Sequence, residues 1–129
     1  MKTEPTSILE RFNQSESEEA VYQQDGDYKA FGVSRHAISL NCISRAGKQF
    51  GISWSLYSDA RYDSEDGLVS EFSHKIVTIK GDHLYDLYQF IIGNRVTFVA
   101  EADRATAKLN SQDDEPVISM LSIEKRRDS

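Results

Sequence analysis

Acidic side chains gather just before Gly67, and their oxygen atoms could serve as calcium ligands. The group consists of Asp59, Asp63, Glu65 and Asp66. An EF-hand loop has its invariant glycine at the sixth position, so Gly67 in that role places Tyr62 first and Ser73 twelfth. Neither side chain is the carboxylate that those positions require. We therefore expect an acidic turn that water solvates.

The remaining reactive side chains are also spaced unlike known sites. His36, His74 and His83 do not recur at metal-ligand spacings, and Cys42 is the only cysteine. Cys42 lies in an apolar strand pattern, which indicates a buried thiol. No serine stands in G-x-S-x-G, and no glycine-rich phosphate loop is found. These patterns predict no cofactor and no metal and favour a protein that is not an enzyme, although residues distant in sequence could still form an active site.

Basic residues near aromatic ones suggest a second chemistry, the binding of single-stranded nucleic acid. The residues concerned are Arg45, Lys48, Trp54 and Arg61. However, Trp54 continues an apolar row that includes Ile52, so a core position is favoured. The net charge of −6 is unevenly distributed, and an acidic N-terminal segment on a neutral body argues against nonspecific binding to nucleic acid.

The clearest helix is predicted over residues 82–92. Its apolar residues recur at helical spacing and form one stripe, made of Leu84, Leu87, Tyr88, Ile91 and Ile92. Asp82 is the expected N-terminal cap, and Gly93 is expected to end the helix in the left-handed conformation.

The clearest hairpin spans residues 38–54. Apolar residues alternate on both arms, and the loop Arg45-Ala46-Gly47 pairs Cys42 with Phe50, Leu40 with Ile52 and Ile38 with Trp54. This register puts all six on one face. Gly47 then occupies the loop position that needs a positive φ.

Other β-rich segments complete the expected fold. Strands are predicted at residues 68–72, 76–80 and 96–101, a short helix around residues 102–109, and a last strand at residues 117–123. We expect an α+β fold, in which a bent antiparallel sheet or small barrel of about six strands packs against one amphipathic helix.

Charge and composition predict how the chain is divided. Residues 1–27 carry two basic and seven acidic side chains and few apolar ones, so we expect a mostly flexible acidic segment. Residues 28–129 are expected to form a single domain, with a linker at residues 110–116 before the last strand. No apolar run is long enough to span a membrane and no secretion signal is seen, so we expect a cytoplasmic protein without membrane contact.

The function is not readable from motifs, and two classes stay open. The favoured one is a small module for protein interaction or assembly, and the alternative is a small nucleic-acid-binding β-domain. We also expect a homodimer, because a last strand isolated by a charged linker must pair with a sheet edge of its own chain or of a neighbour. The expected contact residues are Val117, Ile118, Met120, Leu121 and Ile123.

Overall fold

The computed structural model describes residues 28–126, except for the side chains of residues 110–112. The acidic segment predicted to be flexible, residues 1–27, therefore lies outside the described residues. Eight strands, one short 3-10 helix and two α-helices are found in the described part. In chain order they are β1 (Phe31–Val33), β2 (Ser39–Ile43), β3 (Gln49–Ser53), η2 (Trp54–Leu56), β4 (Tyr57–Asp63), β5 (Gly67–Phe72), β6 (Lys75–Asp82), α2 (Tyr85–Ile92), β7 (Val96–Ala100), α3 (Arg104–Gln112) and β8 (Val117–Lys125).

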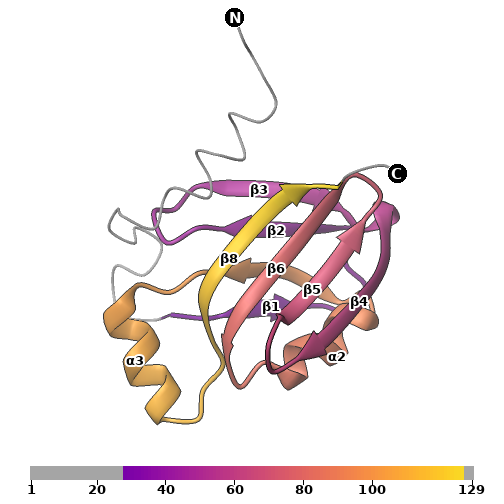
Figure 1. The fold of residues 1–129 in the computed structure, drawn as a ribbon. Coiled ribbons are helices and arrows are strands. Elements are labelled where there is room, and N and C mark those ends of the chain that lie inside the picture. Colours follow the sequence, from indigo (N-terminus) through magenta and orange to yellow (C-terminus); the bar gives the residue numbers. More distant parts are fainter. Residues whose placement is uncertain (1–27, 127–129) are drawn as a thin grey trace, which may run out of the picture.

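The strands form two sheets of four rather than one sheet of about six, which corrects the prediction (Figure 1). One sheet has the order β1-β7-β2-β3, and the other has the order β4-β5-β6-β8. After α2, strand β7 enters the first sheet between β1 and β2, and it runs parallel to β2. The remaining pairs are antiparallel. The structure is thus α+β with mostly antiparallel strands, as predicted, but it has two sheets where one was predicted.

The predicted hairpin is the β2–β3 pair, and its register is confirmed. Cys42 lies opposite Phe50 and Leu40 opposite Ile52. Gly47 has a φ of 88°, which is the conformation that the loop requires. Ile38 differs from the prediction, because it precedes β2 and its side chain is 79% exposed.

The core lies between the two sheets. Alternate residues of both sheets point inward, which is how two packed sheets form an apolar interior. The largest fully buried side chains are Phe72, Leu40, Leu68, Ile79, Leu84, Leu87, Ile91, Ile118, Ile123, Val77, Val96 and Val99. Both sheets and α2 contribute to this single cluster.

Helix α2 lies where predicted but is shorter, and its ends differ from the prediction. It begins at Tyr85, and no side chain caps its N-terminus, so Asp82 is not the cap. At the other end Gly93 has a φ of −90°, and Asn94 takes the left-handed conformation with a φ of 62°. The amide of Arg95 donates to the carbonyl of Phe90, which closes a Schellman-type end one residue later than expected.

The last elements follow the predicted order. Asp103 accepts the amide of Thr106 at 2.7 Å and so caps α3, which packs on β8. Strand β8 pairs antiparallel with β6 of the same chain from Val117 to Lys125. Neither described helix has the length and apolarity that a membrane span requires.

Candidate interaction surface

The predicted contact residues of β8 lie inside the molecule. Val117, Ile118, Leu121 and Ile123 are buried, and Met120 is partly buried. Because β8 pairs with β6 of its own chain, Ile118, Leu121 and Ile123 fill the core of one copy. Self-association through this strand stays a prediction, but its apolar face is already covered.

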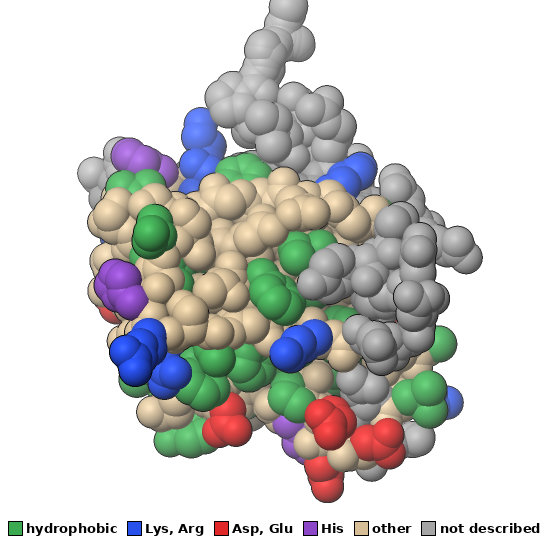
Figure 2. Space-filling view, turned by 180° about the vertical axis from the view of Figure 1, so that it is seen from behind, with side chains coloured by type: hydrophobic (Ala, Val, Ile, Leu, Met, Phe, Trp, Pro, Cys, Tyr) green, Lys and Arg blue, Asp and Glu red, His purple; other side chains and the backbone are tan. Residues whose placement is uncertain are grey.

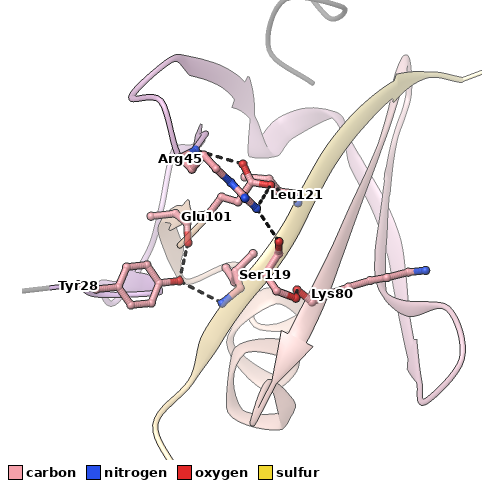
Figure 3. A network of polar contacts seen from close by, with 8 residues as sticks. Tyr28, Arg45, Lys80, Glu101, Ser119 and Leu121 are labelled. Carbon is pink, nitrogen blue, oxygen red and sulfur yellow. Dashed lines mark hydrogen bonds and ion pairs between the residues drawn. The ribbon is translucent and has the colours of Figure 1, made fainter. Parts of the chain in front are cut away.

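Groups of the same chain also occupy the outer edge of β8 (Figure 3). The carboxylate of Glu101 accepts the amide of Leu121 at 3.2 Å, and Arg45 Nη2 donates to the carbonyl of Ser119 at 2.9 Å. Nearer the start of β8, the amide of Ala102 donates to the carbonyl of Ile118 at 2.8 Å. These bonds take up backbone groups that an edge strand would otherwise offer to another chain.

The same cluster contains a buried ion pair between Arg45 and Glu101. Their side chains lie 3.3 Å apart, and Glu101 also accepts the backbone amide of Arg45 at 3.1 Å. Tyr28 adjoins them, donating to the carbonyl of Ala100 at 2.6 Å and accepting the amide of Ile118 at 3.0 Å. Burial raises the pKa of Tyr28, and the negative Glu101 adds to the rise. The cluster ties the β2–β3 turn to β7 and β8, so its role is to hold the sheets together.

The residues of the nucleic-acid hypothesis do not form one surface. Trp54 is buried, its Nε1 donates to the carbonyl of Val96 at 2.8 Å, and its ring contacts Tyr57. Arg45 is buried in its ion pair, while Lys48 lies in the β2–β3 turn at the far end of the hairpin from Trp54. Arg61 is exposed on the other sheet and pairs with Glu71 at 3.3 Å. Trp54 is thus packed in the core and offers no face for base stacking.

The candidate reactive groups are likewise separated. Burial raises the pKa of the Cys42 thiol to about 12, so this thiol stays protonated at neutral pH. Strand β6 separates His74 from His83, and His83 lies 3.5 Å from a carboxylate oxygen of Asp114. No group of three or more His, Cys, Asp and Glu side chains able to hold a metal is found within residues 28–126.

Asp63 stabilises the acidic turn that begins at it. The Asp63 carboxylate accepts the amides of Glu65 at 2.8 Å and Asp66 at 2.6 Å. All four acidic side chains of this group are exposed. The geometry is that of a turn in which aspartate bonds to the backbone that follows it.

An exposed aromatic surface lies on the outer side of α2, and we call it the tyrosine surface. It consists of Tyr62, Tyr85, Tyr88 and Ile92. Tyr85 is 59% exposed, Ile92 47% and Tyr62 38%, whereas Tyr88 is half-buried. The Tyr62 and Tyr88 rings stack with centroids 5.7 Å apart, and the Tyr85 centroid lies 6.4 Å from that of Tyr88. The three rings therefore form a continuous surface across β4 and α2.

Figure 2 shows the molecule from behind. Hydrophobic side chains are exposed at several places on that face, some of them toward the lower left, where α2 lies after the rotation from Figure 1. Sequence reasoning missed the surface because it assigned Tyr88 and Ile92 to the buried stripe. The signal that could have found it is a second helical spacing, with Tyr85, Tyr88 and Ile92 at i, i+3 and i+7.

A cleft of about 310 Å³ adjoins the tyrosine surface at Tyr62. Carboxylates line it from the β4–β5 turn and from the end of β6, and they belong to Asp63, Glu65 and Asp82. The cationic groups of its lining are Lys80 and, when protonated, His83.

Comparisons of this chain with known proteins gave no match. No protein-family model matches the chain, and neither a curated protein nor a solved structure is similar enough to count as a match.

Proposed function

We propose that the protein is a non-enzymatic interaction module and that the tyrosine surface is its recognition site. The observation that carries the proposal is the run of Tyr62, Tyr85, Tyr88 and Ile92 over β4 and α2. Single exposed apolar residues are normal on protein surfaces, whereas contiguous ones mark interaction sites.

The chemistry of these side chains suits protein recognition. Tyrosine is enriched in the buried centre of protein interfaces, since its ring supplies contact area and its hydroxyl can still find a hydrogen-bond partner. A tyrosine also loses little conformational entropy on binding, because it has only two side-chain torsions.

The surface is supported by packing beneath it and by a hydrogen bond on it. Leu87 and Ile91 on the inner face of α2 are fully buried, and α2 contacts both β4 and β7. Gln89 Nε2 donates to the Tyr85 hydroxyl at 2.9 Å, which orients that ring. Preorganisation of this kind lowers the entropic cost of association.

Two other forms of recognition have less support. Nucleic-acid binding was predicted at Arg45, Lys48, Trp54 and Arg61; of these, Arg45 and Trp54 are buried and Arg61 pairs with Glu71. Self-association stays a proposal with a simple test, because light scattering over a concentration series reports the mass of the protein directly. A mass that is strictly monomeric at tens of micromolar would contradict it.

Photo-crosslinking tests the proposed recognition site. The photoreactive residue p-benzoylphenylalanine replaces Tyr85 or Ile92 in the full chain, and a matched variant carries it at Leu109, which is 62% exposed on α3. Irradiation of cells that express each variant should give discrete adducts of the same mass from the first two positions and none of that mass from the third. Equal adducts from all three positions, or no adduct from Tyr85 and Ile92, would contradict the proposal.

A further inference from the structure

The tyrosine surface and its neighbouring cleft differ in chemistry, although Tyr62 belongs to both. The planes of the Tyr62 and Tyr88 rings are only 27° apart, so Tyr62 is held in a stack while more than a third of it stays exposed. A flat aromatic face in this position attracts a cation through the ring quadrupole. Tyr62 therefore adds an aromatic side chain to the lining of a cleft that also carries carboxylates.

The charged side chains that line the cleft favour a ligand group with a positive charge. Asp63, Glu65 and Asp82 provide three carboxylates, against the single ammonium of Lys80. His83 lies next to Asp114, so its charge when protonated is partly balanced. The lining is net negative and complements a positive side chain.

Ring geometry distinguishes between the two basic side chains. Two nearly parallel tyrosines make a stacking platform, not a cage that surrounds an ammonium from several sides. A planar guanidinium can lie flat on such a platform and still donate two parallel hydrogen bonds to a carboxylate. A lysine ammonium can also lie over the ring and pair with a carboxylate, but it cannot stack flat or donate two parallel hydrogen bonds from one plane.

We infer that the cleft receives an arginine side chain of a partner protein, with its guanidinium on Tyr62 and paired to a cleft carboxylate. This inference rests on the proposed function, because the arginine is the anchor of the partner that the tyrosine surface recognises. The cleft volume of about 310 Å³ is at the lower limit of about 300 Å³ for small-ligand pockets, and so suits one side chain.

Short capped peptides test the inference by NMR titration of the full chain. The probes are Ac-Gly-Arg-Gly-amide, the lysine analogue, and the citrulline analogue, which keeps the planar shape of arginine but has no charge. Ring signals of Tyr62 and Tyr88 should shift saturably with the arginine peptide. Binding of the citrulline peptide should be about tenfold weaker, since it lacks the cation–π and charge-assisted contributions. The lysine peptide should be intermediate.

Variants locate the site. Tyr62→Leu and Asp82→Asn should each weaken binding of the arginine peptide several-fold, whereas Tyr62→Phe should bind as the parent does because the aromatic face remains. Glu115→Gln is a matched control, since Glu115 is an exposed carboxylate that lines a different cleft. Thermal unfolding of every variant checks that the fold is retained.

The outcomes separate the inference from the proposed function. Equal binding of arginine and citrulline peptides, or ring signals that no peptide shifts, would overturn the arginine anchor. Adducts from Tyr85 and Ile92 together with such a result would leave the interaction module standing and remove only the arginine. Arginine binding without adducts would instead support the cleft and contradict the wider recognition surface.

Discussion

Loss of the Glu101 carboxylate should be among the most damaging single changes to stability. Glu101→Leu removes the partner of a buried guanidinium and leaves the backbone amides of Arg45 and Leu121 without their acceptor. Breaking a buried ion pair from one side costs about 3–5 kcal/mol. Arg45 Nη2 keeps its bond to the Ser119 carbonyl, so we expect a loss near the lower limit, about 3 kcal/mol.

Urea denaturation followed by circular dichroism measures this loss. With an m-value of about 2 kcal/mol/M, a loss of about 3 kcal/mol lowers the midpoint by about 1.5 M. The double variant Arg45→Met, Glu101→Leu should be more stable than Glu101→Leu alone, because no charge is then left unpaired in the interior. Glu101→Gln keeps one acceptor oxygen and should fall between the parent and Glu101→Leu.

One pair of results would refute the reasoning. If Glu101→Leu lowered the midpoint by less than about 0.5 M at that m-value, the pair would contribute no more than an exposed one. If the double variant were also no more stable than Glu101→Leu, an unpaired Arg45 could not be the cause of the loss.

Three further predictions follow from core packing, a close backbone approach and a buried thiol. Leu87→Ala should lower the free energy of unfolding by about 2–5 kcal/mol, and the matched Ile92→Ala should lower it by less than about 1 kcal/mol, because only Leu87 is fully buried. The urea denaturation midpoints of the two variants test this difference. Gly81→Ala should destabilise the domain by more than about 1 kcal/mol in the same assay, since the added methyl would overlap the Val117 carbonyl at the β6–β8 bulge. Burial raises the pKa of Cys42 from 9.0 to about 12, so the unfolded chain releases the thiol proton first as pH rises. The stabilisation that this buried thiol contributes is complete below about pH 9. It is lost between about pH 9 and 12, by up to about 1.4 kcal/mol per pH unit. The free energy of unfolding, measured between about pH 9 and 10, should therefore fall less steeply with pH in Cys42→Ala.

Local patterns in the sequence were enough to predict six of the eight strands and both α-helices of the described residues, and one register. The β2–β3 hairpin was predictable because apolar alternation and the φ of Gly47 independently require the same pairing. Ile38 escaped the prediction because alternation continues past the end of a strand, whereas burial depends on what the opposite sheet covers. The end of α2 moved by one residue because Asn94, like glycine, tolerates the left-handed conformation.

The same local patterns could not predict how strands that are distant in the sequence pair. Nothing local indicates that β7 enters between β1 and β2, since this choice depends on how α2 reverses the chain over the core. The ion pair of Arg45 and Glu101 joins residues 56 positions apart, so only the assembled sheets reveal that both charges are buried. The tyrosine surface was hidden for another reason, because an apolar residue on a helix indicates burial or recognition equally until its neighbours are placed.

Competition for the photo-crosslinked adduct is the most direct test of the tyrosine surface. An excess of the unlabelled parent protein is added to a lysate before the variant labelled at Tyr85 is irradiated, and the yield of the adduct is measured. The unlabelled parent and the control Leu109→Ser should both suppress the adduct, whereas unlabelled Tyr85→Ser, Ile92→Ser should suppress it much less. Equal suppression by that double variant, shown to be folded by circular dichroism, would contradict the claim that this surface recognises a partner.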